Sequence, residues 1–447
     1  MYARIDFNKI RGNMPEGQRG AFEELVCQLA RRQAPDPKSF RRIEGAGGDG
    51  GVECIHPASG GGIVGYQAKY HTIAGNIDWQ AIDRSVSTAL STYPEFVTYV
   101  IAIACDFTGR RRVKGGTIGD GTWGEWDRRV EKWQGEAIKR GRSVEFIPWT
   151  ADELASLLTP INAAGLRTYW FGETEFSHNW FRTRVELAVA ALDERYNPDD
   201  HVDVRIQSLF EFIIRHSKAR EKLGDPFMAI RKLPFPEHRL RGAEPRPSDE
   251  LLNRSVDALQ RLMASEPGLM SPIWESWAVE KWGRLTNDAV TKVRELQDWW
   301  WEKRSDLKVP EQETARRDVE VVYYDLSNIY SELQSLDNLL KGRYLIAERK
   351  RAALIAGRAG TGKSHLLACV AELAVSETRP VILILGQQLR DQALWPQILE
   401  RLGLQDLSAE EFLGALDAAA ESVRIRGLIL VDAINEGPGA RSPCLSR

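Results

Sequence analysis

The chain has 447 residues, 43% of them hydrophobic and 28% charged, which is the composition of a globular protein and excludes a largely disordered one. Its 60 Lys and Arg residues against 63 Asp and Glu residues leave a net charge of -3, which excludes a uniformly basic nucleic-acid coat but not a local basic groove. The five scattered cysteines form no CxxC pair, which argues against a zinc finger or a disulfide framework and favours a reducing cytoplasm.

Three segments follow one another along the chain. Residues 1–172 mix short strands and helices, residues 173–340 are mostly helical, and residues 341–447 return to an alternation of strands and helices. This order predicts an α/β protein with an N-terminal mixed sheet flanked by helices, a helical middle region and a C-terminal parallel α/β domain. No stretch approaches the roughly 18 apolar residues of a membrane span, so we expect no membrane partner.

The first segment opens with an amphipathic helix. Its apolar residues recur at i, i+3, i+4, i+7 and i+8, namely Phe22, Leu25, Val26, Leu29 and Ala30. At 100° per residue, Glu23 lies at the edge of this stripe, and Glu24 is expected nearly opposite it, in solvent. The further predicted elements are a strand at 40–44, a hairpin with arms 52–56 and 63–70, a helix near 78–91, a buried strand at 97–104, a helix near 125–140 and a strand at 143–149.

The middle segment consists of amphipathic stretches near 180–194, 205–217, 249–264, 277–303 and 318–341. Six of the fourteen tryptophans lie between Trp274 and Trp301. We expect them to form a core between helices, with an aromatic binding surface as the alternative.

Polar side chains gather around the predicted hairpin. Asp49 lies in a glycine run, Glu53 lies in the first arm, and Gln67 and Lys69 are two residues apart on the second arm, so they share one face. The spacing of the arms predicts that Glu53 lies close to Gln67 and Lys69. On the preceding helix, Glu23 is the carboxylate that could lean into the same site.

These residue types suit metal-dependent hydrolysis. Mg²⁺ takes oxygen ligands and commonly one or two carboxylates, so Asp49, Glu53 and Gln67 are the candidate ligands. A bound metal lowers the pKa of its water, and Lys69 could orient that water or stabilise developing charge. Each residue alone also has an ordinary structural explanation, such as an aspartate in a glycine-rich turn. The hypothesis therefore depends on all of them occurring in this order.

The set resembles the PD-(D/E)xK nuclease superfamily and, within it, the Mrr-like restriction endonucleases. The carrying residues are Phe22-Glu23, the block GDGGVE that ends at Glu53, and Gln67-Ala68-Lys69, within roughly residues 18–105 and extending towards 172. The family usually has Asp where Glu53 stands, and Gln67 is a variant familiar among Mrr-like members. The resemblance implies metal-dependent cleavage of double-stranded DNA and leaves open whether Asp49 or Glu53 is the principal metal ligand.

A second motif lies at residues 357–364, which read GRAGTGKS and match GxxxxGK[ST]. Apolar residues at 352–356 predict a strand before the loop, and the pattern at 365–375 predicts a helix after it. Backbone N–H groups of such a loop surround the phosphates of ATP, its lysine reaches the β/γ-phosphates, and its serine hydroxyl binds Mg²⁺. The candidate nucleotide-binding residues of the loop are Gly357, Gly360, Thr361, Gly362, Lys363 and Ser364.

Further along, an apolar strand at 427–432 ends in Asp432, and residues 381–385 predict a neighbouring parallel strand. The Asp432 carboxylate could hold Mg²⁺ through water, and Glu436 could polarise an attacking water. A buried strand that ends in an aspartate for structural reasons is the alternative.

The phosphate loop and the DAINE run at 432–436 resemble the STAND class of signalling ATPases, over about residues 340–436. Joined to an Mrr-like nuclease, the order resembles the bacterial antiviral STAND proteins of the Avs group, in which a segment like Arg195-Tyr196-Asn197-Pro198 also occurs. The resemblance implies ATP-dependent changes of oligomeric state and a C-terminal sensor for a phage protein. Few residues follow Asp432, so we expect a member truncated after this motif.

Three hypotheses follow for function. The first is an antiviral effector, a Mg²⁺-dependent DNA endonuclease gated by an ATP-binding module and assembled into a homo-oligomer when active. The second is a type IV-like restriction endonuclease that acts on modified DNA under NTP control. The third is an inactive remnant that only binds nucleotide or DNA.

Overall fold

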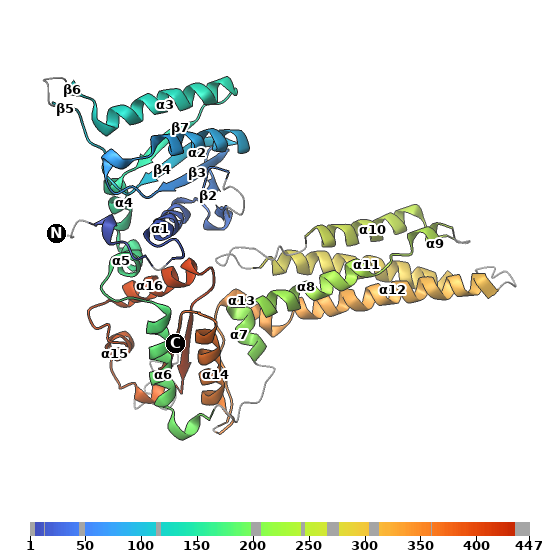
Figure 1. Ribbon diagram of the computed structural model, residues 1–447. Helices are drawn as coiled ribbons and strands as arrows, with labels where there is room; N and C mark the ends of the chain where they lie inside the picture. The colour runs from blue at the N-terminus through green and yellow to red at the C-terminus, as the bar shows by residue number, and fades with distance from the viewer. Residues whose placement is uncertain are drawn as a thin grey trace. The chain divides into compact units, whose positions relative to one another are not determined.

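The structure, a computed structural model, is a mixed α/β protein (Figure 1). It forms two compact units, of which the first comprises Met1–Tyr196 and Leu367–Arg447 and the second comprises Asn197–Leu366. The residues that the structure describes are 5–12, 14–43, 50–112, 118–197, 207–242, 246–265, 277–303, 313–358 and 360–433.

A five-stranded mixed sheet forms the N-terminal part of the first unit, in the order β1-β2-β3-β4-β7. The first three strands pair antiparallel, whereas β3, β4 and β7 run parallel to one another. The predicted hairpin is confirmed as β2 and β3, and the predicted apolar strand is confirmed as the buried β4. The strands are β1 (Arg41–Arg42), β2 (Cys54–Pro57), β3 (Ile63–Lys69), β4 (Phe96–Ile103) and β7 (Glu145–Trp149), and a separate pair is β5 (Arg111–Arg112) and β6 (Ile118–Gly119).

Helices cover both faces of this sheet (Figure 1). The predicted helices α2 (Trp79–Thr92) and α3 (Gly121–Lys139) share one hydrophobic core with β4, and Asp83 of α2 accepts a 2.8 Å hydrogen bond from Trp133 Nε1 of α3. The opening helix, α1 (Gln18–Gln33), packs against β3 on the opposite face.

Three helices follow the last strand of this sheet, β7, in the sequence. They are α4 (Ala151–Leu158), α5 (Ala164–Phe171) and α6 (His178–Ala190), of which the periodicity predicts α6 alone. A capping box between Thr150 and Glu153 starts α4 directly after β7.

The expected solvent exposure of Glu24 is wrong. Its residue surface is only 4% exposed, and its carboxylate accepts two hydrogen bonds, of 2.5 and 2.6 Å, from the guanidinium of Arg42 on β1. The reason is that α1 is covered on more than its apolar stripe, because α5 and α16 (Ala409–Ser422) also lie against it. A pattern of apolar residues on one helix does not reveal a second, polar contact face.

The C-terminal part of the first unit has a small parallel sheet. Its strands β8 (Val381–Leu385) and β9 (Leu428–Asp432) confirm two predicted strands, and α14 (Lys363–Ser376) confirms the helix after the phosphate loop. Two helices, α15 (Leu394–Arg401) and α16, lie between these two strands in the sequence.

The strand predicted at 352–356 is wrong. The described residues there form no strand, and Leu354 is 92% exposed. A short apolar run becomes a strand only when a neighbouring strand pairs with it and buries its side chains, and residues 352–356 have neither.

The second unit is helical. Its long helices α11 and α12 pack along each other, and buried Trp277, Trp282 and Trp300 confirm the expected core between helices. Trp301 is exposed on α11, and Trp274 lies outside the described residues. The helices are α7 (Gln207–Ile213), α8 (Ser217–Lys232), α9 (Glu237–Arg241), α10 (Asp249–Ala264), α11 (Val279–Lys303), α12 (Glu313–Leu340) and α13 (Arg343–Lys350).

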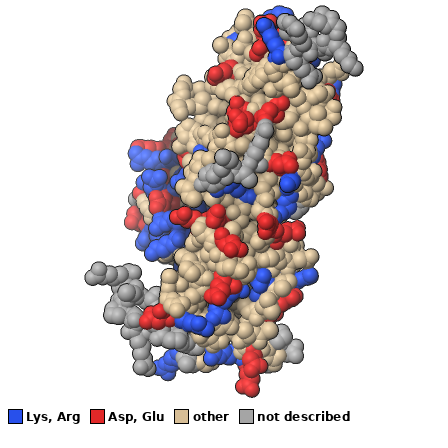
Figure 2. Space-filling view, turned by 90° about the vertical axis from the view of Figure 1, so that its left-hand side faces the viewer, with Lys and Arg blue, Asp and Glu red and all other residues tan. Residues whose placement is uncertain are grey.

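Two features of the structure match expectations from the sequence, the mixing of charges on the surface and the polarity of the helices. Figure 2 shows that the Lys and Arg side chains on this face are interspersed with Asp and Glu side chains. Among the described residues, no helix combines the length and the apolarity that crossing a bilayer requires.

Candidate active site

The turn before β2 depends on glycine. Gly50 and Gly51 have φ angles of +59° and +82°, in the left-handed region that favours glycine. A Cβ on Gly51 would lie 2.2 Å from the Ser85 carbonyl oxygen of α2, and the hydroxyl of Tyr99 donates a hydrogen bond to the Gly51 carbonyl. The turn therefore passes directly against α2 and fixes where Glu53 enters the sheet.

The hairpin brings Glu53 and Gln67 into contact, as their spacing predicts. Cys54 pairs with Tyr66 in the antiparallel register, and the Glu53 amide donates to the Tyr66 carbonyl at 2.8 Å. Gln67 Nε2 then donates to Glu53 Oε1 at 2.5 Å. The contact joins the first arm of the hairpin to the second at the carboxyl-terminal end of β3.

The amide oxygen of Gln67 has no hydrogen-bond partner among the described residues. Gln67 is 1% exposed, so this oxygen is buried. A buried amide oxygen without a partner costs about 1–3 kcal/mol unless another group binds it. Because its Nε2 is already engaged with a carboxylate, Oε1 has the position and the chemistry of a cation ligand.

Lys69 is the last residue of β3, on the same strand face as Gln67 and half-buried. Its charge reaches Glu23 on α1. Burial raises the pKa of Glu23, whereas the bond to Arg19, the charge of Arg19 and the charge of Lys69 all act to lower it, and the net shift is upward. The two residues are thus electrostatic neighbours across two different elements.

Arg19 is a residue of this neighbourhood that the sequence argument missed. Its Nε donates to Glu23 Oε1 at 3.1 Å, and its pKa is raised by the bond to Glu23 and, more weakly, by the charge of Glu53. The spacing of Arg19 and Glu23, i and i+4 on one helix, is a signal that could have found it. The charge of Lys69 therefore acts on Glu23, and the charges of Glu23 and Glu53 act on Arg19, so residues of the helix and the hairpin interact electrostatically.

The donor set fits a hard divalent cation. Glu53 offers carboxylate oxygens and Gln67 offers its unsatisfied Oε1, which is the kind of sparse protein ligation that Mg²⁺ accepts together with water and phosphate. No group of three or more His, Cys, Asp or Glu side chains with metal-binding geometry occurs among the described residues. Asp49, the other predicted ligand, lies outside them.

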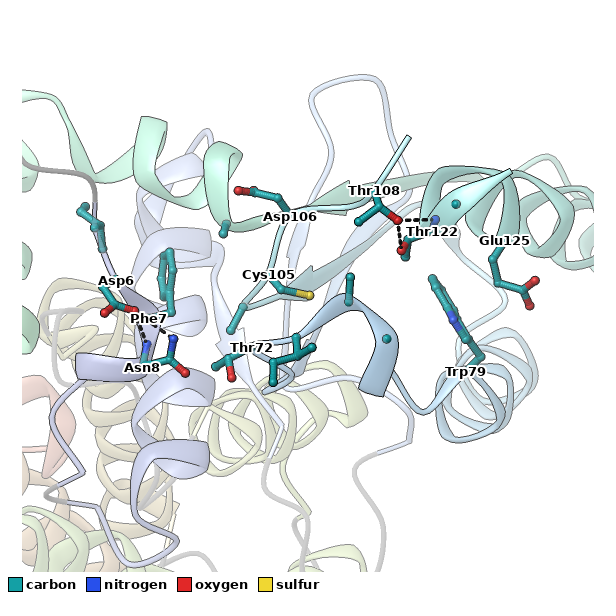
Figure 3. Close-up of a pocket in the computed structure, with 17 residues that line it drawn as sticks. Asp6, Phe7, Asn8, Thr72, Trp79, Cys105, Asp106, Thr108, Thr122 and Glu125 are labelled. Carbon is teal, nitrogen blue, oxygen red and sulfur yellow. Dashed lines mark hydrogen bonds between the residues drawn. The ribbon is translucent and has the colours of Figure 1, made fainter. Parts of the chain in front are cut away.

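An open cavity of about 960 Å³ lies beyond the ends of β3 and β4 (Figure 3). It is lined by 72–75 after β3, by 104–106 and Thr108 after β4, by the start of α3 and by 5–8 near the N-terminus. Thr108 and Thr122 hydrogen-bond across one side of it at 2.9 Å. Glu53, Gln67 and Lys69 do not line it, so the cavity is distinct from the candidate site.

Two glycines of the phosphate loop adopt the left-handed backbone conformation that glycine favours. Gly360 and Gly362 have φ angles of +75° and +78°, and Lys363 begins α14 with Ser364 directly after it. Lys363 Nζ donates to the carbonyls of Gly357 and Arg358 at 2.9 and 2.8 Å, and Thr361 Oγ1 also donates to Arg358. Two of the three N–H donors of this ammonium are therefore engaged with loop carbonyls, and the third could bind a phosphate oxygen.

Asp432 and Glu436 are the remaining residues predicted to bind nucleotide. Asp432 is buried and ends β9, beside Leu385 at the end of the parallel strand β8. Tyr196, which follows α6, donates a hydrogen bond to Glu372 of α14. Glu436 lies outside the described residues.

Comparisons with known proteins leave the family open. No family model matches the sequence, and no curated protein or solved structure matches it either.

Proposed function

We propose that this chain is a metal-dependent DNA endonuclease whose activity is controlled by an ATP-binding segment of the STAND type, in the service of antiviral defence. The observation that carries the proposal is the part-buried Gln67–Glu53 hydrogen bond, which leaves the buried Gln67 Oε1 without a hydrogen-bond partner among the described residues, two residues before Lys69 on β3. The phosphate-loop motif and the resemblances described above support the ATP-dependent control.

The residues divide the work of hydrolysis among them. Glu53 and Gln67 would hold Mg²⁺, with Asp49 as the alternative principal ligand. The bound metal supplies a water of lowered pKa and a counter-charge for the phosphate. Lys69 donates hydrogen bonds toward the attacking water or the charged phosphate oxygens, and Glu23 fixes Arg19 and Lys69 at the rim by charge.

The first test is metal-dependent cleavage by the full chain. We expect supercoiled plasmid to be cut with Mg²⁺ and not with EDTA, and Glu53→Gln to lose at least a hundredfold in rate because a neutral amide is a weaker Mg²⁺ ligand. The matched control is Glu145→Gln, an exposed carboxylate on β7. Cutting that survives EDTA or ignores Glu53→Gln would reject the site, and cutting confined to methylated plasmid would favour the restriction hypothesis.

Nucleotide binding is tested separately. Lys363→Ala should weaken binding of labelled ATP by roughly ten- to a hundredfold, because a hydrogen bond to a charged group contributes about 1.5–3 kcal/mol. Lys350→Ala, on the exposed end of α13, serves as the control and should bind like the parent chain. Unchanged affinity in Lys363→Ala would remove the phosphate-binding role.

A further inference from the structure

Helix α16 joins the C-terminal part of the first unit to its N-terminal helices (Figure 1). It crosses α5 so closely that a Cβ on Gly165 would lie 2.3 Å from the backbone of Gly414. Gln28 of α1 donates to the Ala418 carbonyl at 3.3 Å and accepts a 2.9 Å bond from Trp170. The segment that follows the phosphate loop is thus packed against the helix that carries Glu23.

Four charged side chains meet at this contact, of which Glu24 and Glu421 are buried and Arg31 and Arg42 are partly exposed. Arg31 Nη2 of α1 lies 2.5 Å from Glu421 Oε2 of α16, and Arg42 forms two bonds with Glu24 of α1. Arg42 also approaches Glu421 Oε1 at 4.0 Å. Two guanidinium groups and two carboxylates therefore neutralise one another, and Glu421 is the member that α16 contributes.

Glu24 and Glu23 are consecutive on α1 and point to different partners about 100° apart. The two-pronged bond from Arg42 to Glu24 holds the rotation of α1 about its own axis, and that rotation sets where Glu23 stands relative to Lys69. Removing one member of a buried ion pair leaves the other uncompensated, so the network acts as a unit.

Resting on the proposed nuclease function, we infer that Glu421 and Arg42 are positioning residues of the nuclease site. Through them, the docking of α16 decides whether α1 presents Glu23 to the cluster of Glu53, Gln67 and Lys69. In the docked state the cluster is complete, and release of α16 frees the rotation of α1 and lowers the rate of cleavage.

The charges at this contact are only partly compensated. Glu421 Oε1 and Arg42 Nε are buried without a hydrogen-bond partner among the described residues. Burial raises the pKa of Glu421 to about 7, and the charges of Arg31 and Arg42 only partly oppose this, with Glu24 and Asp417 adding to the rise.

Two variants of the full chain test this inference. Glu421→Gln keeps the shape of the side chain and removes its charge, and Arg42→Lys keeps the charge and removes the two-pronged geometry. Both should lower kcat for plasmid cleavage on the order of tenfold and leave KM for DNA unchanged, because residues that orient a site's ligands without touching the substrate have effects of this size. Both should also speed hydrogen exchange of the α1 amides.

The matched control is Asp417→Asn, on the same helix, with a side chain that is 71% exposed and 3.9 Å from Arg31. It should leave kcat and α1 exchange at the parent values. Parent kcat and parent α1 exchange in both test variants would overturn the inference, as would a change confined to KM. If the parent chain itself cuts no DNA, the nuclease proposal fails, and α1 exchange in Glu421→Gln still decides the coupling.

Discussion

Replacing Lys69 by alanine is expected to abolish plasmid cleavage, with a loss of at least a hundredfold in kcat. Lys69 is the ammonium at the end of β3 whose charge reaches Glu23, and it shares a strand face with Gln67. A charged donor placed where charge develops during hydrolysis contributes on the order of 10²–10³ in rate. The measurement is single-turnover cleavage of supercoiled plasmid at saturating Mg²⁺.

Lysine-to-alanine replacement at Lys139 is the matched control for this experiment. Lys139 is an exposed residue in the last turn of α3, and the Lys139→Ala variant should cut plasmid at the parent rate. If Lys69→Ala cuts as fast as the parent chain, Lys69 has no part in the chemistry and the candidate site is wrong. If both variants lose activity, the loss reflects DNA attraction by net charge, which rising salt concentration would reveal.

Replacing Arg215 by alanine is expected to destabilise the second unit by about 3–5 kcal/mol, because it removes the guanidinium that pairs with a buried carboxylate. Arg215 Nε donates to Glu348 Oε1 of α13 at 2.9 Å, and the two side chains are 1% and 0% exposed. The guanidinium also lies 4.9 Å from the ring centre of Trp277. Urea denaturation combined with hydrogen exchange of α13 measures the loss for this unit.

The comparison for Arg215 is Arg349→Ala on the same helix as Glu348. Arg349 pairs with Glu280 at 2.6 Å, but both side chains lie at the surface. An exposed pair contributes about 0–1 kcal/mol, so this variant should unfold close to the parent chain. Equal stabilities for Arg215→Ala and Arg349→Ala would contradict the importance of the buried pair.

The parts of the fold that the sequence predicted are those set by local patterns. The apolar stripe at Phe22 to Ala30 predicted α1, and the hairpin spacing predicted both arms and the contact of Glu53 with Gln67. The uninterrupted apolar runs predicted β4, β8 and β9. In each case the residues that decide the structure lie within one element or one turn of each other.

The parts that the sequence could not predict depend on partners far along the chain. Glu24 is buried because Arg42 and α16 cover a face of α1 that looks polar in isolation. Residues 352–356 look like a strand, but strand formation requires a neighbour, and the described residues supply none. The role of Arg31 is equally hidden, since nothing near it in sequence indicates Glu421.

The bond between Arg31 and Glu421 joins residues that are 390 positions apart, and this separation sets an order of events during synthesis. At about 5–20 residues per second, roughly 20–80 s pass between the translation of the two partners. Until then the polar face of α1 that carries Gln28 and Arg31 lacks its cover. The N-terminal helices therefore reach their final packing only after α16 has been synthesised, so a polypeptide that ends before α16 should be prone to proteolysis.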